Sequence, residues 1–443
     1  MLTLFFDATP LGLWEQADLH KTGIGRMATQ SLRALLRRTD LRVILVCPCG
    51  MEDLVLRFLA KNAWASGAEP AFSLSEKNSA SWTKNAAERL KDVARKFLAP
   101  MPSKIQAAVK RLAGVRPFTS YEGENSALRE AVISRMPPEG CAAWFSCFHP
   151  IPDAVANIQG LQCHVVIHDI IPLRLADKHP FSGPCRDLMG QHLKKADVIW
   201  ANSEFTQRDF LDYFPDVPEK MVQVALHGGG EHFQPTGQEE TAALLAACGL
   251  PADCPYFLSL ATLEPRKGLL DVIRAFNELA PRDGRVHLIL VGQKGWNYRR
   301  ILRECSHNER IHMPGFLPDA SVAGLLRGCL GFLYMSEYEG FGLPVVEAMS
   351  CGAPVIAAKA TSLIEVSGDA VLFVEPGDIG ALAKAMARLH DSSALRAALR
   401  EKGLMRSRRF TWNNFAATIV AGMKTPPSSQ EGGTVATVHT PRE

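Results

Sequence analysis

Short apolar runs alternate with stretches of helical periodicity along most of the 443-residue chain. The runs are short enough for strands, and continuous Val, Ile, Leu and Phe is typical of parallel sheets covered on both faces. They occupy residues 2–6, 43–46, 143–148, 165–167, 198–201, 256–261, 286–291, 331–335 and 355–358. Strands that alternate with helices predict an α/β fold built of right-handed βαβ units.

The strands form two series, separated by a polar region rich in Pro and Gly at residues 228–255. The chain is longer than one ordinary domain. We therefore expect two doubly wound, Rossmann-like domains with parallel sheets, over residues 1–235 and 250–405. Apolar spacing over residues 406–424 predicts a last helix. Residues 425–443 lack a core-forming pattern and are expected to be a disordered tail.

Composition narrows the class of protein. A content of 47% hydrophobic and 21% charged residues is ordinary for a soluble globular protein, and a net charge of +3 gives no case for nucleic-acid binding. No apolar run approaches the roughly 18 residues of a membrane-spanning helix, and the first residues, MLTLFFD, predict a strand and not a signal peptide. The eleven cysteines lack zinc-ligand spacing, so we expect reduced thiols in a cytoplasmic protein.

One segment, residues 84–116, is strongly basic. It holds nine Lys and Arg residues against Glu88 and Asp92, a local charge of +7. Apolar residues at helical spacing predict two short amphipathic helices, broken at Pro100 and Pro102. Two interpretations stay open: peripheral docking on an anionic membrane, or packing of the apolar stripes on the N-terminal sheet with a solvated basic face.

The segment EGFGLPVVE places two carboxylates, Glu339 and Glu347, eight positions apart across a glycine-rich turn. Pro344 suits the first turn of a helix, where its missing N–H is not needed, and Gly352 predicts where that helix ends. The free N–H groups of such a turn and the helix dipole favour an anion. Both acids can then face one ligand that carries phosphate and hydroxyl groups, as a sugar nucleotide does. Alternatively, the turn is an ordinary one and Glu347 a solvated helix residue.

Two adjacent cations, Arg266 and Lys267, follow an apolar strand in the sequence SLATLEPRKG. They precede a helix predicted over residues 269–279. Arg can hold two oxygens of a diphosphate at once, and Lys adds a mobile charge. Such a pair would stabilise the negative charge that builds on a departing nucleoside diphosphate. Taken alone, the pair would be an ordinary surface feature.

A glycine-rich turn, TGIGR, precedes a helix predicted over residues 27–36. Gly23, Gly25 and Ala28 satisfy the G-x-G-x-x-A pattern of dinucleotide-binding folds. In such folds the turn directly follows the first strand, whereas thirteen residues intervene here, and the acid expected after the second strand is missing. Both departures argue against a dehydrogenase.

His168 and Asp169 follow the strand in VVIHDIIPL. A polar pair at the carboxyl end of a parallel strand lies where ligands bind in doubly wound sheets. The alternative is a loop histidine with only a structural role.

The turn from Glu339 to Glu347 resembles the E-x7-E motif of retaining glycosyltransferases of the GT-B fold, in glycosyltransferase family four. TGIGR, HDIIPL, LEPRKG and LVGQKGW, in this order, are most similar to bacterial mannosyltransferases of O-antigen and exopolysaccharide assembly. The resemblance spans residues 1–424 and implies two domains facing a cleft, with the last helix crossing back onto the N-terminal domain. It implies a retaining transfer of a sugar from a nucleoside diphosphate to a hydroxyl acceptor.

The resemblance assigns roles to individual residues. Glu347 would hold the ribose hydroxyls and Glu339 the transferred sugar, Gly25 would approach the donor phosphates, and Gly292 would form a turn beside the nucleotide. The expected catalytic residues are Arg266, Lys267, Glu339 and His168. The expected substrate-binding residues are Gly23, Gly25, Arg26, Asp169, Gly292, Phe341, Gly342, Leu343 and Glu347, with Phe341, Gly342 and Leu343 acting through their backbone N–H groups.

One departure from the family concerns charge. Many members carry an additional Arg just after the first strand of the second domain, where this chain has Leu260, Ala261 and Thr262. Arg266 must take that role, or charge stabilisation is weaker here.

The chain also lacks a D-x-D pair, the metal-holding motif of the other major glycosyltransferase fold. We therefore expect a metal-independent enzyme without a cofactor, in which cations and helix N-termini replace the metal.

The expected substrates follow from the resemblance. The donor is a nucleoside diphosphate sugar, with GDP-mannose favoured over UDP- and dTDP-sugars, and the acceptor is a glycan or a lipid-linked glycan. The protein would act in the cytoplasm, and residues 84–116 are the candidate for a peripheral contact with the inner face of the membrane if the first of the two interpretations above holds. Two other classes remain open. An epimerase of the same fold would need a further acid–base pair, and a non-catalytic paralogue would usually have lost one of the key charges.

Overall fold

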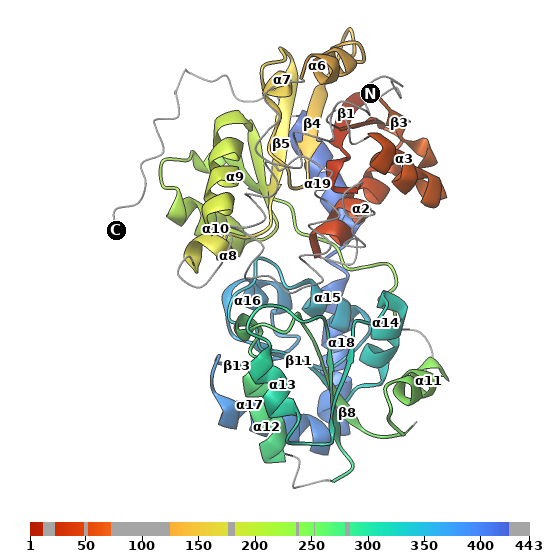
Figure 1. Ribbon diagram of the computed structural model, residues 1–443, viewed down its shortest axis with the longest axis vertical. Helices are drawn as coiled ribbons and strands as arrows, with labels where there is room; N and C mark the ends of the chain where they lie inside the picture. The colour runs from red at the N-terminus through yellow and green to blue at the C-terminus, as the bar shows by residue number, and fades with distance from the viewer. Residues whose placement is uncertain are drawn as a thin grey trace, which may run out of the picture. The chain divides into compact units, whose positions relative to one another are not determined.

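The computed structural model describes residues 1–11, 23–47, 52–71, 125–175, 182–235, 239–251, 253–279 and 284–424 (Figure 1). Contacts within the chain define two compact units. The N-terminal unit comprises Met1–Leu226 and Trp412–Glu443, and the C-terminal unit comprises His227–Thr411. The predicted amphipathic helices at residues 84–116 and the predicted disordered tail at 425–443 lie outside the described residues.

The N-terminal unit is built on a seven-stranded sheet of order β3-β2-β1-β4-β5-β6-β7, with every neighbouring pair parallel. Its strands are β1 (Leu2–Asp7), β2 (Leu41–Val46), β3 (Glu69–Pro70), β4 (Ala142–Ser146), β5 (Leu161–Ile167), β6 (Val198–Ala201) and β7 (Val222–Val224). Its helices are α2 (Gly23–Leu36), α3 (Glu52–Lys61), α6 (Asn125–Ile133), α7 (Asp153–Ala156), α8 (Ile171–Arg174), α9 (Ser182–Lys195), α10 (Glu204–Tyr213) and α19 (Trp412–Lys424), with 3-10 turns η2 (Ala63–Gly67) and η4 (Glu219–Met221).

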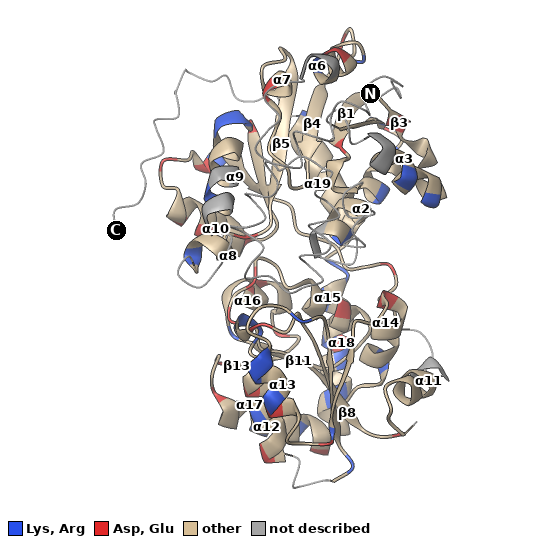
Figure 2. Ribbon diagram, viewed as in Figure 1, with Lys and Arg blue, Asp and Glu red and all other residues tan. Residues whose placement is uncertain are grey.

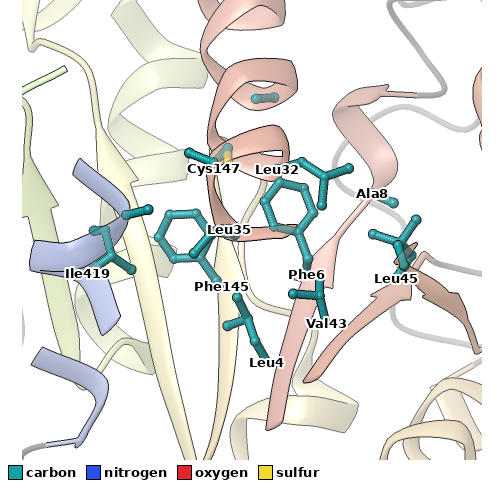
Figure 3. Packing of buried hydrophobic residues seen from close by; sticks show 14 of the residues in the cluster. Leu4, Phe6, Ala8, Leu32, Leu35, Val43, Leu45, Phe145, Cys147 and Ile419 are labelled. Carbon is teal, nitrogen blue, oxygen red and sulfur yellow. The ribbon is translucent and has the colours of Figure 1, made fainter. Parts of the chain in front are cut away.

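Alternate residues of each strand enter two separate cores, because successive side chains of a strand point to opposite faces of the sheet. Leu4 and Phe6 of β1 enter the core under α2 and α19, whereas Phe5 enters the core under α6, α9 and α10. Figure 3 shows Leu4, Phe6 and Phe145 packed with Leu32 of α2 and Ile419 of α19. Both faces are therefore buried, as parallel sheets require.

The C-terminal unit repeats this design with a six-stranded parallel sheet of order β10-β9-β8-β11-β12-β13. Its strands are β8 (Tyr256–Leu260), β9 (His287–Val291), β10 (Ile311–Gly315), β11 (Gly331–Tyr334), β12 (Val355–Ala358) and β13 (Leu372–Val374). Its helices are α11 (Glu239–Ala247), α12 (Leu269–Leu279), α13 (Arg299–Cys305), α14 (Asp319–Gly328), α15 (Leu343–Ser350), α16 (Thr361–Ser367), α17 (Ile379–Asp391) and α18 (Ser393–Ser407), with the 3-10 turn η5 (Pro265–Lys267).

The predicted fold class is confirmed: two doubly wound α/β units, each on a parallel sheet. All nine predicted strands are present. Four further strands, β3, β7, β10 and β13, were not predicted, because they are short or interrupted. Pro70 ends β3, and Pro314 and Gly315 lie within β10, whose register shifts between His312 and Gly315.

Two helix boundaries differ from the prediction. Helix α2 begins at Gly23, so Gly23–Arg26 form its first turn and not a loop before it. The predicted helix over 406–424 is two segments: α18 ends at Ser407 and α19 begins at Trp412. Between them Phe410 packs on Phe341, and its carbonyl accepts the N–H of Gly229 at 3.0 Å, a bond that a continuous helix could not form.

Helix α19 packs beside α2 on the N-terminal sheet, although nearly 400 residues separate the two helices in the chain (Figure 1). Phe415, Ile419 and Met423 are fully buried in the core they share with β1, β2 and β4. Lys424 ends the helix with an ion pair to Asp40 at 2.7 Å. The last described helix is therefore part of the N-terminal unit's core.

Charged residues of both signs are interspersed along the helices of both units (Figure 2). Helix α13 carries three arginines and one glutamate, α12 carries two acidic residues and one arginine, and α16 carries one glutamate and no basic residue. Among the described helices, none combines the length and the apolar character needed to cross a membrane.

Gly422 lies where α19 crosses Trp200 of β6, and a Cβ there would meet the indole at 2.5 Å. Trp200 is buried, and its Nε1 donates to His164 Nδ1 at 3.0 Å, so the ring has little freedom to move. We expect Gly422→Ala to lower the free energy of unfolding by about 1–3 kcal/mol in urea titrations.

Gly190 of α9 is the matched control, because a Cβ there meets nothing within 4 Å. Gly190→Ala should raise the free energy of unfolding by about 0.5–1 kcal/mol through its helix propensity alone. Equal effects of the two substitutions would contradict the packing of α19 against β6.

Candidate active site

The polar residues of the C-terminal unit converge where β8, β11 and β12 end. These strands are neighbours in the sheet and all run parallel, so their carboxyl ends lie at one edge. The loop after β8 carries Arg266 and Lys267, the loop after β11 carries Glu339, and α16 follows β12. Ligands of doubly wound sheets bind at this edge.

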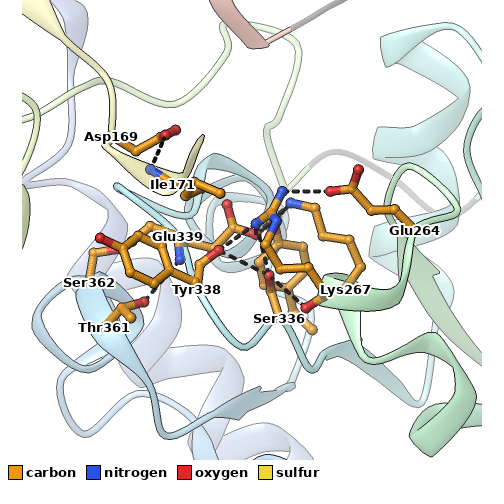
Figure 4. Close-up of polar contacts among 11 residues, drawn as sticks. Asp169, Ile171, Glu264, Lys267, Ser336, Tyr338, Glu339, Thr361 and Ser362 are labelled. Atoms are coloured by element: carbon orange, nitrogen blue, oxygen red, sulfur yellow. Dashed lines mark hydrogen bonds and ion pairs between the residues drawn. The ribbon is translucent and has the colours of Figure 1, made fainter. Parts of the chain in front are cut away.

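Arg266 lies in the short 3-10 turn η5, and its backbone carbonyl accepts the N–H of Glu337 at 2.9 Å. Its guanidinium then bonds to both loops: Nη2 donates to Glu264 at 2.6 Å and Nη1 to Glu339 at 3.2 Å (Figure 4). Nη1 also donates to the carbonyl of Tyr338. Arg266 thus ties the loop after β8 to the loop after β11, and only 13% of its side chain is exposed.

Lys267 completes the contacts of Glu339. Its Nζ lies 2.5 Å from Glu339 Oε1 and 3.2 Å from the hydroxyl of Tyr334, the last residue of β11. The Tyr334 hydroxyl also donates to Glu339 Oε1, at 2.9 Å. One carboxylate oxygen therefore receives hydrogen bonds from Arg266, Lys267 and Tyr334.

Electrostatics at this carboxylate follow from its two cationic partners. Burial raises the pKa of Glu339, but Lys267 and Arg266 outweigh it and bring the pKa from 4.5 down to about 2. Burial and the nearby Glu339 charge raise the pKa of Tyr334 well above its ordinary value, so Tyr334 stays a neutral donor. The site holds an ionised carboxylate at every physiological pH.

The two cations are balanced by two carboxylates, because Glu264 and Glu339 both pair with Arg266. Arg266 was expected to replace the additional Arg of related enzymes. Its bond to Glu264 competes with that role. An incoming diphosphate would have to share both guanidinium and ammonium with these carboxylates. Such a balance keeps the buried charges satisfied before any ligand binds.

Gly342 forms the turn between Glu339 and Glu347, with φ of 92° and ψ of 47°. This left-handed conformation suits glycine, and a Cβ there would also meet the Leu363 side chain at 2.5 Å. Helix α15 starts at Leu343, so Pro344 is its second residue. Glu347 is buried on this helix, with 1% of the residue exposed. It is therefore not a solvated helix residue.

Phe341 and Gly292 fix the positions of loops at the site, one by packing and one by allowing a close approach. The Phe341 ring is buried between His227, at a centroid distance of 5.4 Å, and Phe410, at 5.7 Å. Gly292 follows β9, and a Cβ there would lie 1.9 Å from the carbonyl oxygen of Ala261. Only glycine allows the loops after β8 and β9 to approach this closely.

In the N-terminal unit, His168 directly follows β5. Its Nε2 lies 2.8 Å from the carbonyl oxygen of Cys147, which can only accept, so Nε2 carries the proton. Burial lowers the pKa of His168 to about 4, and the imidazole is neutral at pH 7. Asp169 Oδ1 accepts the N–H of Ile171 at 2.9 Å and so caps α8.

The glycine motif of the N-terminal unit lies within α2. Gly23 is the first residue of the helix, Gly25 the third and Arg26 the fourth. The carbonyl of Gly25 accepts the hydroxyl of Thr29 at 2.9 Å, a bond within the helix. Arg26 is half-buried.

A polar cluster where β1 and β4 end was not predicted from the sequence. Asp7 accepts hydrogen bonds from the N–H of Thr9 at 3.0 Å, the Thr9 hydroxyl at 2.6 Å and the Ser146 hydroxyl at 3.1 Å. His149 Nδ1 lies 3.7 Å from Asp7, and burial lowers the pKa of His149. The signal was present, since Asp7 directly follows an apolar strand, as His168 does.

The structure thus brings Arg266, Lys267 and Glu339 into one hydrogen-bonded network within the C-terminal unit, with Glu347 on the adjoining helix. His168, Asp169, Gly23, Gly25 and Arg26 lie in the N-terminal unit, each at a strand end or helix start. Sequence reasoning missed several direct partners of the network, among them Glu264, Tyr334 and Thr361, whose hydroxyl oxygen accepts the Glu339 N–H at 3.0 Å. Among the described residues, no group of three or more His, Cys, Asp or Glu side chains is arranged to hold a metal ion.

Comparison with known proteins identifies relatives. Residues 243–405 match the family model described as "Glycosyl transferases group 1". The chain is 30% identical over 264 residues to O-antigen chain mannosyltransferase B of Escherichia coli, covering 58% of this chain and 68% of that protein. It is 29% identical over 278 residues to the serotype-specific mannosyltransferase WbdA of E. coli, covering 60% of this chain and about a third of that protein, 34%.

Solved structures share the fold at low sequence identity. The HepE protein of Anabaena, in complex with UDP and glucose, superposes with a TM-score of 0.60 and 18% identity, covering 96% of this chain and 99% of that one. Sucrose-phosphate synthase of Thermosynechococcus elongatus superposes with a TM-score of 0.60 and 16% identity, covering 95% and 98%.

The depressed pKa of Glu339 predicts an acid-sensitive contribution to stability. A carboxylate whose pKa is lowered on folding stabilises the protein above the unfolded pKa, near 4.5, and this stabilisation is lost as pH falls toward 2. We expect Glu339→Gln to lower the free energy of unfolding at pH 7 by on the order of 3 kcal/mol. In urea titrations, the difference from the wild type should shrink between about pH 5 and about pH 3.

Glu375→Gln is the control, because Glu375 is 62% exposed and pairs only across the surface with Lys359. It should change stability by less than about 1 kcal/mol at any of these pH values. A difference for Glu339→Gln that stays constant across the acid range would contradict an ionised, cation-paired carboxylate.

Proposed function

This chain belongs to the glycosyl transferases of group 1, and we propose that it transfers mannose from GDP-mannose to a hydroxyl group of a glycan or lipid-linked glycan. The choice of mannose rests on the two relatives described above, both of which are named mannosyltransferases. The guanine base rests on the sequence resemblance to enzymes of O-antigen and exopolysaccharide assembly.

The observation that carries the proposal is the network of Arg266, Lys267 and Glu339. These three side chains are largely buried and lie at the carboxyl edge of the C-terminal sheet. Two cations there provide the charge that a diphosphate needs, and a fixed carboxylate provides the acceptor that sugar hydroxyls need. A nucleotide sugar carries both groups side by side.

In the proposed complex the donor's diphosphate binds Arg266 and Lys267. As the glycosidic bond breaks, negative charge grows on the leaving nucleoside diphosphate, and the two cations stabilise it. The N–H groups of Phe341, Gly342 and Leu343, at the start of α15, add a partial positive charge. These groups take the part that a divalent metal plays in other glycosyltransferases, so the proposed reaction needs no metal.

In the proposed complex, Glu347 and Glu339 bind different hydroxyl groups of the donor. Glu347 lies on α15 and would accept from the ribose hydroxyls, and Glu339 would accept from the transferred sugar. Because its pKa is about 2, Glu339 is ionised and can only accept. The resemblance assigns His168 of the N-terminal unit to the transferred sugar, and the low pKa of its imidazole argues against a role as a general acid.

We further propose that the anomeric configuration is retained, with the acceptor attacking the face from which the diphosphate leaves. The leaving phosphate would take the acceptor's proton. This mechanism comes from the resemblance to family-four enzymes.

The ten cysteines of the described residues are free thiols, which supports a cytoplasmic site of action.

Ligand-dependent stability tests the donor. At 100 times its dissociation constant a ligand of the folded state adds about 2.7 kcal/mol, a readable rise in melting temperature. We expect GDP-mannose to raise the melting temperature more than UDP- or dTDP-sugars do, with and without EDTA. A shift that EDTA abolishes would contradict the metal-free site, and no shift with any sugar nucleotide would contradict the transferase.

Lys267→Met tests the diphosphate contact. Removal of one positioned donor to a developing negative charge costs about 10²–10³ in rate, so kcat should fall by that factor in a coupled assay of nucleotide release. Lys359→Met is the matched control, because Lys359 is 56% exposed and lies in the same unit. It should leave kcat within about twofold of wild type.

Anomeric proton NMR of the product then reports retention or inversion.

A further inference from the structure

Two side chains of helix α16 form hydrogen bonds with the backbone of Glu339, one with its N–H and one with its carbonyl. The N–H of Glu339 donates to Thr361 Oγ1 at 3.0 Å, and its carbonyl accepts from Ser362 Oγ at 2.8 Å (Figure 4). The next residue, Leu363, is fully buried against Gly342, where a Cβ would meet its side chain at 2.5 Å. Three successive residues of α16 therefore contact the turn that carries Glu339.

Thr361 holds this position at a conformational cost. Its φ of 48° is in the left-handed region, which a β-branched residue rarely adopts. Strained residues of this kind persist where the surroundings fix them, and they gather at functional sites. Glycine would fill the position without strain, but it would bring no hydroxyl to Glu339.

Capping of the helix does not explain the strain. The N-cap of α16 is Ala360, which makes no side-chain capping bond. The Thr361 hydroxyl instead accepts a hydrogen bond from outside its own helix, 22 positions back in the chain. The two hydroxyls therefore act on Glu339.

The two cationic partners of Glu339 cannot secure it fully during the proposed reaction. Arg266 and Lys267 are the groups that a diphosphate would engage, and any shift of these cations toward phosphate weakens their hold on the carboxylate. Tyr334 and the backbone bonds to α16 remain. The position of the carboxylate then depends on how firmly its backbone is held.

We propose that Thr361 and Ser362 are positioning residues, which hold Glu339 at the transferred sugar while Arg266 and Lys267 bind the diphosphate. This inference rests on the proposed function, because it assumes a sugar nucleotide as donor. The strain at Thr361 is retained because the hydroxyl must reach the N–H of Glu339.

Thr361→Gly separates activity from stability. Glycine removes the hydroxyl and relieves the left-handed strain, so the variant should melt at the same or a higher temperature than the wild type. We expect its kcat for sugar transfer to fall by at least tenfold. Thr361→Ser, which keeps the hydroxyl, should stay within about threefold of wild type. Ser362→Ala tests the carbonyl bond separately and should also lower kcat.

Affinity for GDP provides a readout that a general structural defect would move. GDP lacks the sugar, so its dissociation constant, measured by calorimetry, should be unchanged in Thr361→Gly, whereas transfer from GDP-mannose falls. In a double-mutant cycle with Glu339→Gln, the Thr361→Gly substitution should cause no further loss of kcat, because both act through one carboxylate.

Three outcomes would overturn the inference. Thr361→Gly could keep wild-type kcat, weaken GDP binding as much as it slows transfer, or multiply the loss caused by Glu339→Gln. If the wild type neither binds nor turns over any sugar nucleotide, the proposed function fails and the inference fails with it. An active wild type with an unaffected Thr361→Gly variant refutes the inference alone.

Discussion

A single buried carboxylate oxygen, Oε1 of Glu339, joins the two loops on which the candidate site depends. It receives hydrogen bonds from Arg266 and Lys267 after β8 and from Tyr334 at the end of β11. Neither cation could be buried alone without a large loss of solvation, and neither could the carboxylate. Because the opposite charges neutralise one another, all three groups can be buried at the edge of the sheet. Out of bulk water, such charges stabilise a leaving group most effectively.

Much of this arrangement could be predicted from the sequence. Apolar runs located nine strands, and the resemblance to family-four glycosyltransferases grouped Arg266, Lys267 and Glu339 in one site. Strands β7, β10 and β13 could not be predicted, because three residues or an internal proline leave too little pattern. The break at residues 408–411 was missed for a different reason: Phe410 is apolar and continues the helical spacing, yet it packs on Phe341, far away in the sequence.

The partners of the network were beyond a pattern-based prediction. Tyr334 looks like any aromatic residue at the end of a strand, and only its neighbours in space turn its hydroxyl toward Glu339. The contact made by Thr361 depends on a positive φ, which the residue type argues against. Arg266 was expected to face a ligand, whereas much of its hydrogen-bonding capacity is already used by Glu264 and the carbonyl of Tyr338. Local rules predict where functional groups lie more reliably than what they touch.

The position of α19 has a consequence for how the chain is made. Its apolar face fills a core whose other walls, which include β1, β2, β4, β6 and α2, all lie within the first 225 residues. During synthesis those strands emerge with that face only partly covered, by α2, α3 and η2, and the core is complete only when residue 424 has emerged. By then the whole C-terminal unit, His227–Thr411, is already outside the exit tunnel. The unit that is translated last can therefore complete its core first, which reverses the usual order of vectorial folding.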